Sequence, residues 1–244
     1  MSMNVSKGNM YDWVTHQHSH LGGECPHKCS YCYVDHPDRG RASKYCGELR
    51  LIESEFKTAY GRENTIFIEH CNDLFCKEVP TGWITRILAH CYEYPENKYM
   101  YQTKNPARFL DFINILPPNS ILGTTIETDS GQPDHISKAP STLDRAEAMA
   151  EIRSYIRGGY IRTSRPDIKI FVTIEPIMDF NVDILSRWIT SIRPDFLNIG
   201  ADSMGHGLIE PTFEKIIQLV ERLRKNGVEV RKKHNLERLE KLSV

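Results

Sequence analysis

The chain has 244 residues, of which 40% are hydrophobic and 26% charged, and its formal net charge is −1. This balance gives no overall electrostatic attraction to nucleic acid, and no apolar run approaches the roughly 20 residues of a membrane span. The first residues lack the apolar core of a signal peptide, so we expect a cytoplasmic protein built as a single domain over residues 1–244.

The first motif along the chain is THQHSH, in which His16, His18 and His20 alternate with other residues. In an extended strand, residues two apart point to the same face, so the three imidazoles would share one side. A second metal site is one interpretation, because imidazole is a common metal ligand. The preferred interpretation is that these histidines are polar residues at the end of the first strand, near the mouth of the site.

Residues 22–34 have the sequence GGECPHKCSYCYV and place Cys25, Cys29 and Cys32 within eight positions. The chain has seven cysteines, an odd number. Their clustering favours metal ligation in a reducing compartment over a disulfide framework. The stretch therefore predicts a loop that folds around a metal ion or a metal cluster.

Two kinds of metal site compete for these thiols. A structural zinc site takes four ligands, usually in two pairs, and here the fourth would have to be a histidine such as His27 or His36. A four-iron cluster normally has four cysteine ligands, and with three of them one iron keeps an open coordination position. The sequence favours the iron–sulfur cluster and leaves the Cys3His zinc site as an alternative.

Beyond the cysteines, short apolar runs alternate with segments whose hydrophobic residues recur at helical spacing. The runs are β-branched or aromatic and apolar on both faces, as buried parallel strands are. Repeated βα units give a barrel or a doubly wound sheet, and no phosphate-binding glycine motif follows a strand. The expected strands are 65–68, 98–102, 120–126, 168–174 and 196–200. The expected helices are 49–60, 81–94, 104–115, 142–157, 181–192 and 211–226.

Polar residues follow nearly every expected strand, and this pattern favours the barrel. In a parallel barrel the carboxyl ends of all strands lie on one rim, where active sites are found. Helix capping would explain any one such residue, but five strands with the same pattern indicate a shared polar mouth. The polar residues at these ends include Glu69, His70, Asn72, Asp73, Gln102, Thr103, Lys104, Thr125, Glu127, Glu175, Asn198 and Asp202.

The spacing C-x3-C-x2-C, with Tyr31 directly before the last cysteine, resembles the signature loop of the radical S-adenosylmethionine (SAM) superfamily. In that family the loop follows the first strand of a partial (β/α)6 barrel, an α/β fold class that the strand pattern also favours. Stretches such as FIEHCNDLF, LGTTIETD and TIEPIMDF are similar to a phage- and prokaryote-associated branch of the superfamily. A weaker likeness, mostly confined to the cysteine loop, is to spore photoproduct lyase and its relatives.

The resemblance implies a specific chemistry. Cys25, Cys29 and Cys32 would hold a [4Fe–4S] cluster, and the amino and carboxylate groups of SAM would chelate the fourth iron. One electron from a flavodoxin- or ferredoxin-like donor would cleave SAM to methionine and a 5′-deoxyadenosyl radical, which abstracts hydrogen from a substrate. The protein would position SAM and exclude water and stray hydrogen donors.

The resemblance also implies contacts to SAM. Tyr31 would pack near the adenine or the cluster. The glycine-rich motif that holds the SAM amino group in many members is absent after residues 65–68, and Asn72 or Asp73 is expected to take its place. The remaining expected contacts are the ribose hydroxyls with Thr125 and Glu127, and SAM or substrate with Glu175 and Asp202.

Cys71 follows the first apolar run on the expected active rim. The lyase relatives use a cysteine to donate hydrogen to a substrate radical, so Cys71 is a candidate for that role. An inert buried thiol is the preferred interpretation. An auxiliary cluster would need Cys46, Cys71, Cys76 and Cys91 to converge from distant positions, and it is disfavoured.

Two further segments and two further functions stay open. The polar loop 129–145 is expected as a lid or a substrate contact, with a solvated loop as the alternative. Arg231, Lys232 and Lys233 are interpreted as a solvated basic surface in preference to a phosphate site. Besides a radical SAM enzyme with an unidentified substrate, the chain could be a nucleic-acid-directed lyase or modification enzyme of the same superfamily. It could also be a non-catalytic zinc or iron–sulfur module that binds nucleic acid.

Overall fold

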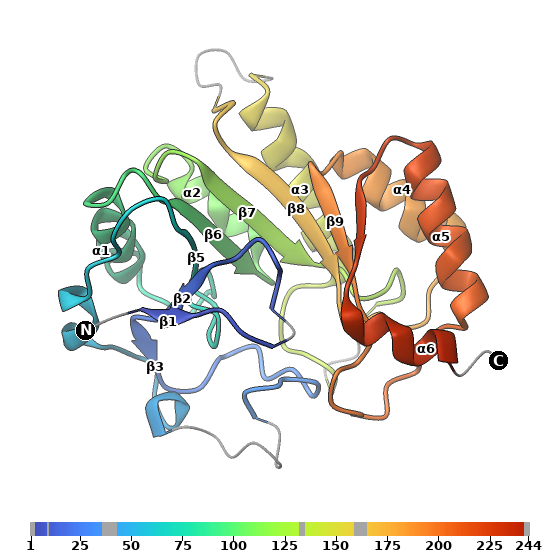
Figure 1. Ribbon diagram of the computed structural model, residues 1–244, viewed down its shortest axis with the longest axis horizontal. Coiled ribbons are helices and arrows are strands. Elements are labelled where there is room, and N and C mark those ends of the chain that lie inside the picture. Colours follow the sequence, from blue (N-terminus) through green and yellow to red (C-terminus); the bar gives the residue numbers. More distant parts are fainter. Residues whose placement is uncertain (1–2, 9, 36–42, 132–134, 159–164, 242–244) are drawn as a thin grey trace.

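The computed structural model describes residues 3–8, 10–35, 43–131, 135–158 and 165–241. Its core is an eight-stranded sheet in which the first strand pairs antiparallel and all later neighbours pair parallel. In spatial order its strands are β1 (Asn4–Val5), β2 (His16–His18), β5 (Thr65–Ile68), β6 (Lys98–Thr103), β7 (Ser120–Thr125), β8 (Lys169–Ile174), β9 (Phe196–Ile199) and β10 (Val230–Lys232). Figure 1 shows the helices along the outer side of this sheet, with the N-terminal segment crossing in front of it.

The α/β partial barrel predicted from the sequence is confirmed, and β5 to β9 lie where the apolar runs place them. All six residues of β7 are buried, as expected for a central parallel strand covered on both faces. The sequence did not predict β10, because the strand is short and two of its residues, Arg231 and Lys232, are charged. A charged, short strand suits its position at the edge of the sheet, where exposed backbone must be protected from pairing with other chains.

Four of the expected helices are confirmed, and their first residues explain where they begin. Ser141 and Asp144 form a reciprocal capping box on α3, and the side chain of Asn181 accepts two backbone N–H groups of α4. The helices are α1 (Thr81–Tyr92), α2 (Phe109–Phe112), α3 (Thr142–Ile156), α4 (Val182–Ile192), α5 (Phe213–Lys225) and α6 (Glu237–Lys241).

Two helix predictions were wrong. The segment 49–60 contains β4 (Arg50–Leu51) and a short 3-10 helix, because its first residues pair with β3 (Leu21–Gly22) in a second, two-stranded sheet. The segment 104–115 is helical only in a 3-10 turn and the four residues of α2. The residue before Pro106 is biased away from helical conformation, which delays the start of that helix.

An apolar layer closes the amino-terminal end of the barrel. Trp13 meets Phe171 and Phe196 edge-on, with ring centroids 5.7 and 5.3 Å apart, so the N-terminal segment seals this end. Gly123 is required beside them, since a Cβ there would lie 2.1 Å from the Phe171 ring. The buried members of the layer are Tyr11, Val14, Phe67, Met100, Ile121, Phe171 and Phe196.

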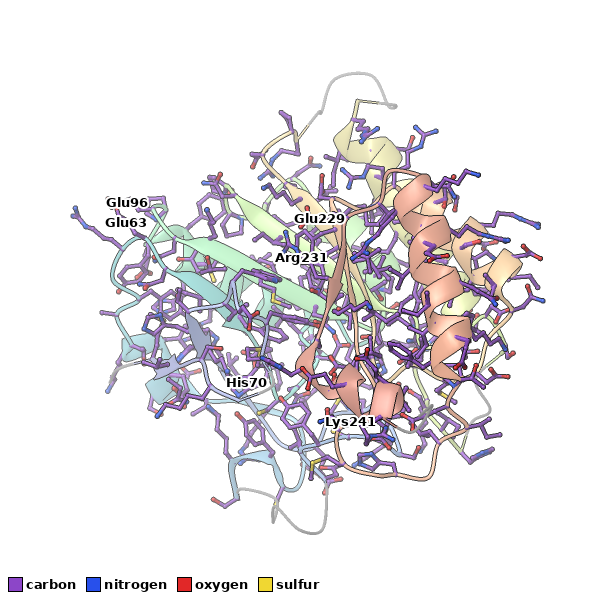
Figure 2. All side chains as sticks on the ribbon, turned by 45° about the vertical axis from the view of Figure 1, so that its right-hand side comes forward. Glu63, His70, Glu96, Glu229, Arg231 and Lys241 are labelled. Carbon is purple, nitrogen blue, oxygen red and sulfur yellow. The ribbon has the colours of Figure 1, made fainter. Side chains whose placement is uncertain are left out.

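The opposite end of the barrel is where the chain leaves each parallel strand. In Figure 2, Glu63 and Glu96, which precede β5 and β6, lie at the upper left, and His70, which follows β5, lies below and to the right of them, toward the lower middle of the view. The expected polar mouth therefore lies on the His70 side. Within the described ranges, none of the helices is long and apolar enough to cross a membrane.

Candidate functional site

A cavity of about 520 Å³ lies at the carboxyl ends of the parallel strands. The thiols of Cys25, Cys29 and Cys32 line it together with residues that follow β8, β9 and β10. This volume lies in the range of small-molecule and cofactor sites. The other expected site residues among its lining are Tyr31, Cys71, Asn72, Asp73, Thr125, Glu175 and Asp202.

Two glycines hold the start of the cysteine loop against its end. Gly22 belongs to β3, which pairs antiparallel with β4 and closes the base of the loop. Gly23 has a φ of +86°, and a Cβ there would lie 2.1 Å from the carbonyl oxygen of Glu48. Its N–H donates to the carbonyl of Lys44 over 2.8 Å. Only glycine fits such a backbone, which explains the pair of glycines before the first thiol.

The loop after β7 braces the cysteine loop from the other side. The N–H of Lys138 donates to the carbonyl of His27 over 2.8 Å. The Ser137 hydroxyl lies 3.2 Å from the thiol of Cys29. This described part of the polar loop 129–145 therefore packs on the cysteine loop.

Tyr31 connects the cysteine loop to a buried charge network. Its hydroxyl donates to Glu127, whose side chain is fully buried. Glu127 also accepts from Nζ of Lys104 at 2.5 Å and from Nη1 of Arg145 at 2.9 Å. Burial would raise the pKa of Glu127, but the two cations outweigh it and lower that pKa to about 2. Both Glu127 oxygens therefore have protein partners, and Tyr31 and Lys104 are the members of this network that line the cavity.

Asn72 and Asp73 follow β5 and anchor neighbouring loops. Asp73 accepts the backbone N–H of Lys104 at 2.8 Å, and the same oxygen lies 2.9 Å from Nε2 of His27. Asn72 donates to the carbonyl of Gly23 over 3.1 Å. Burial opposes charge on both Asp73 and His27, yet their attraction lowers the pKa of Asp73 and raises that of His27. Asp73 thus ties the middle of the cysteine motif to the end of β6.

The donor set suits a metal cluster better than a single ion. Among the described residues, no three His, Cys, Asp or Glu side chains are placed to hold one metal ion. Nε2 of His27, one of the two histidines considered for a zinc centre, contacts Asp73 and Cys76, while His36 lies outside the described residues. In a four-iron cluster each thiolate binds a different iron, so the thiols need not converge on one point. Three half-buried cysteines facing one cavity fit this requirement.

Cys76 is a further cysteine next to the motif. It is fully buried, its thiol lies 3.2 Å from Nε2 of His27, and it hydrogen-bonds the thiol of Cys25. The sequence placed Cys76 among the scattered cysteines, because it lies far along the chain from the motif of Cys25, Cys29 and Cys32. In the part of the chain that the structure describes, no auxiliary metal site forms around it.

Cys71 lines the cavity beside two tyrosines. The Tyr33 hydroxyl lies 3.7 Å from its Sγ and donates to the carbonyl of His70 at 2.6 Å. Tyr45 also hydrogen-bonds this thiol. Burial raises the pKa of Cys71, so the thiol keeps its hydrogen at neutral pH.

His18 and His20 lie in a cluster of packed rings, and none of the three alternating histidines lines the cavity. His20 is fully buried, with Nδ1 3.1 Å from Glu69 and Nε2 3.0 Å from the Tyr60 hydroxyl. His18 packs edge-on against His20, and burial lowers the pKa of His18 to about 3. The second metal site considered for His16, His18 and His20 is not formed by the residues the structure describes.

The wall opposite the cysteines is built from paired polar side chains. Glu175 accepts from Nζ of Lys233 at 2.6 Å and from Nδ2 of Asn235 at 2.7 Å. Thr125 accepts from the side-chain amide of Gln102 over 3.1 Å. The interpretation of Lys233 as part of a solvated surface was wrong, because its ammonium reaches back to Glu175 and lines the cavity.

His206 is the functional candidate that the sequence did not predict. It lines the cavity, and its Nδ1 lies 2.6 Å from Oδ1 of Asp202. Gly205 and Gly207 on either side have φ values of +72° and +70°. In the sequence, the only sign of this turn is that His206 stands between two glycines, which can adopt the positive φ values of a tight turn. A single loop histidine nevertheless indicates no chemistry until its partner is known.

A family model described as "Protein of unknown function (DUF5131)" matches residues 22–153, from the start of the cysteine loop into α3. No curated protein sequence matches the chain.

Among the solved structures similar to this chain are two variants of spore photoproduct lyase and a radical SAM methyltransferase. One is a spore photoproduct lyase variant with bound AdoMet and dinucleoside spore photoproduct, 13% identical, with a TM-score of 0.53 and coverage of 91% of this chain and 66% of that one. A second variant of that lyase is 11% identical, with a TM-score of 0.58 and coverage of 93% and 79%. A radical SAM methyltransferase from Sphaerobacter thermophilus is 16% identical, with a TM-score of 0.54 and coverage of 93% and 69%. This chain thus spans about two thirds to four fifths of their lengths and shares their fold, as the cysteine motif predicted.

Proposed function

The chain belongs to the family described as "Protein of unknown function (DUF5131)", and within it we propose that this protein is a radical SAM enzyme. The observation that carries the proposal is the C-x3-C-x2-C motif, whose three thiols line one cavity at the carboxyl ends of a partial parallel barrel. The fold shared with radical SAM structures supports it. The proposed reaction is hydrogen abstraction from a substrate, started by reductive cleavage of SAM.

Cys25, Cys29 and Cys32 are the proposed ligands of a [4Fe–4S] cluster, which leaves one iron for the amino and carboxylate groups of SAM. The bound cluster would supply the electron that cleaves SAM to methionine and a 5′-deoxyadenosyl radical. A flavodoxin- or ferredoxin-like protein in the cytoplasm is the proposed electron donor.

The protein's own residues hold the cysteine loop and close the floor of the cavity. Gly23 allows the two ends of the loop to meet, and the Tyr31 hydroxyl ties the loop to buried Glu127. The apolar layer around Trp13 closes the floor. A reactive radical needs such a site, since water and stray hydrogen donors must be kept out.

The proposed SAM contacts divide by side of the cavity. Tyr31, Asn72 and Asp73 lie with the cysteines, where the adenine and the SAM ammonium would be bound. Thr125 lies at the end of β7, where a ribose hydroxyl would be bound. Glu127 would not contact the ribose directly, because both of its oxygens have protein partners. It would instead position Tyr31 and Lys104, which line the cavity. Glu175 and Asp202 belong to the opposite wall, which we assign to the substrate.

Cys71 is the proposed hydrogen donor to a product radical. Its thiol is protonated, lines the cavity and contacts the hydroxyl of Tyr33 at 3.7 Å. Donation of the hydrogen atom would leave a thiyl radical, which the external electron donor and a proton would return to the thiol.

The proposal is tested by anaerobic reconstitution with iron and sulfide. We expect about four irons per chain, a brown chromophore, and 5′-deoxyadenosine when SAM and dithionite are added. Cys29→Ser should abolish the chromophore and the 5′-deoxyadenosine, whereas Cys46→Ser, at an exposed cysteine outside the motif, should retain them. One zinc per chain without a brown chromophore would contradict the radical mechanism. A cluster without 5′-deoxyadenosine would instead indicate electron transfer or binding.

A nucleic-acid-directed lyase or modification enzyme is the second candidate. One structure of similar fold contains a dinucleoside spore photoproduct, and Lys7 lines this chain's cavity as an exposed cation. Fluorescence anisotropy with a labelled single-stranded and a duplex oligonucleotide would test it over a range of salt concentrations. Affinity that falls as salt rises would support it, because phosphate contacts release counterions. No binding at low salt would leave a small-molecule or protein substrate.

A further inference from the structure

Cys76 is a buried thiol to which the proposed function gives no role. It lies in the segment between β5 and α1, it is fully buried, and it does not line the cavity. Among the described residues, its side chain has two hydrogen-bond partners, Nε2 of His27 at 3.2 Å and the thiol of Cys25. Both partners belong to the cysteine motif, so Cys76 touches the motif without being part of it.

The backbone on both sides of Cys76 is held in place. Its N–H donates to the carbonyl of Asp73 over 3.3 Å. Its carbonyl accepts the N–H of Val79 at 3.1 Å and the guanidinium of Arg108. Such supporting contacts fix the position of a side chain. The contact between Cys76 and the motif is therefore built into the fold.

The hydrogen bonds around His27 determine where the Cys76 hydrogen points. The carboxylate of Asp73 accepts two backbone N–H groups, at 2.8 and 3.0 Å, and lies 2.9 Å from Nε2 of His27. Nε2 therefore donates to Asp73, and it carries this hydrogen whether the ring is neutral or protonated. A nitrogen that donates has no lone pair for the thiol of Cys76. The sulfur of Cys25 is then the acceptor for the Cys76 S–H.

Binding of iron would fix the direction of the hydrogen bond between the two sulfurs. A cysteine that binds a metal is a thiolate, so an iron-bound Cys25 has no hydrogen to donate. The S–H group is a weak donor, but a hydrogen bond to a charged acceptor is stronger than one between neutral groups. Cys76 is fully buried, so water does not compete for its hydrogen.

We propose that the S–H group of Cys76 donates a hydrogen bond to the sulfur of Cys25 and thereby raises the reduction potential of the cluster that Cys25 binds. Cys76 is a positioning residue and not a ligand, and the inference rests on the proposed function. Hydrogen bonds to the sulfurs are among the factors that set the potential of an iron–sulfur cluster. Reduction adds negative charge, so a donor stabilises the reduced form more than the oxidised form. The external electron donor would then reduce the cluster at a less negative potential.

The first test is a redox titration of the reconstituted protein, followed by electron paramagnetic resonance of the reduced cluster. At a fixed potential near the wild-type midpoint, we expect Cys76→Ala to lower the ratio of reduced to oxidised cluster several-fold. Cys91→Ala is the matched control, because Cys91 is a fully buried cysteine of α1 that does not line the cavity. It should keep the wild-type ratio.

The sign of the change separates this role from a purely structural one. A smaller side chain that only loosened the packing would let water approach the cluster. Water would stabilise the more negative reduced form and raise the ratio of reduced to oxidised cluster. A ratio that is unchanged or raised in Cys76→Ala would therefore overturn the inference.

The second test measures the S–H stretching band of Cys76 by infrared spectroscopy on the reconstituted wild-type protein. The loss of this band in Cys76→Ser assigns it, and serine is close enough in size to cysteine to serve if the alanine variant does not fold. On reduction of the cluster we expect the band to move to lower frequency, because the hydrogen bond strengthens. The band of Cys91, assigned with Cys91→Ala, should not move. A Cys76 band that stays in place would overturn the inference.

Iron content and 5′-deoxyadenosine formation by the wild-type chain separate the two proposals. If no four-iron cluster assembles, the proposed function fails and this inference fails with it. If the cluster assembles without forming 5′-deoxyadenosine, the proposed function fails, and the redox ratio and the S–H band still decide the role of Cys76. If 5′-deoxyadenosine forms and Cys76→Ala leaves the redox ratio unchanged, this inference alone fails.

Discussion

The two sides of the cavity are built in different ways. On the cysteine side, a short loop supplies three cysteines within eight positions and is tied down by a glycine pair and a buried charge network. On the opposite wall, Glu175 is paired with Lys233, which follows another strand and lies 58 positions away. The difference teaches that the proposed cofactor side is built largely from residues that are close in sequence, while the proposed substrate side is assembled by the fold. It also predicts that mutations on the cysteine side cost more stability.

The largest stability effect is expected for Arg145→Met. Among the described residues, the change leaves buried Glu127 with Lys104 as its one remaining cationic partner, and breaking a buried ion pair costs about 3–5 kcal/mol. Chemical denaturation monitored by tyrosine and tryptophan fluorescence measures the loss. Arg157→Met, at an exposed position after the same helix, is the control and should change the free energy of unfolding little. A loss below about 1 kcal/mol for Arg145→Met would show that the network does not hold the cysteine side together.

The next effect concerns pH. The pKa of Glu127 is lowered from 4.5 to about 2, so its ionised form should contribute about 3 kcal/mol of stability above pH 4.5. That contribution is lost as the pH falls from 4.5 toward 2, because the unfolded chain binds the proton first. The free-energy difference between wild type and Glu127→Gln should therefore shrink over this window. Glu147→Gln, at an exposed residue of α3, is the control. A difference that stays constant from pH 7 to pH 3 would contradict the assignment.

Gly23→Ala is expected to cost about 2 kcal/mol, since it combines a left-handed backbone with a steric overlap. The added Cβ would lie 2.1 Å from the carbonyl oxygen of Glu48. Gly47→Ala separates the two causes, because Gly47 has a φ of +76° but no atom within 4 Å of an added Cβ. Unfolding free energies of both variants, together with hydrogen exchange at Lys44 to Cys46, measure the effects. Equal losses in the two variants would mean that close packing of the loop ends contributes nothing.

The cysteine side could be predicted from the sequence because its information is local. The spacing of Cys25, Cys29 and Cys32 can be read from eight consecutive positions, without knowledge of which other elements the loop contacts. Buried strands such as β7 were also predictable, since all of their residues are apolar or small. By contrast, the segment 49–60 was misassigned as a helix, because its pairing with Leu21 and Gly22 is a tertiary contact that no local pattern reveals.

The opposite wall could be predicted only in part. Glu175 and Asp202 were found because they follow strands, but their partners could not be found in the same way. Lys233 belongs to an unpredicted edge strand region, and His206 lies on a loop whose geometry comes from two glycines. A charged residue in sequence looks the same whether it faces solvent or an ion-pair partner, so the interpretation of Lys233 as a surface residue was wrong.

The smallest effect tests the wall itself, through Lys233→Gln. The ammonium of Lys233 lies 2.6 Å from Glu175, and the two side chains are 12% and 16% exposed. Removing this ion pair should lower the free energy of unfolding by about 1 kcal/mol. Lys232→Gln is the control, because Lys232 is exposed and its ammonium lies 5.6 Å from the ring centroid of Phe213. Denaturation at low and high salt measures both variants, and only the Lys233 effect should persist at high salt, since partly buried pairs are screened less. If the two variants behave alike, the Glu175–Lys233 pair does not hold the wall, and the wall is then free to rearrange around its substrate.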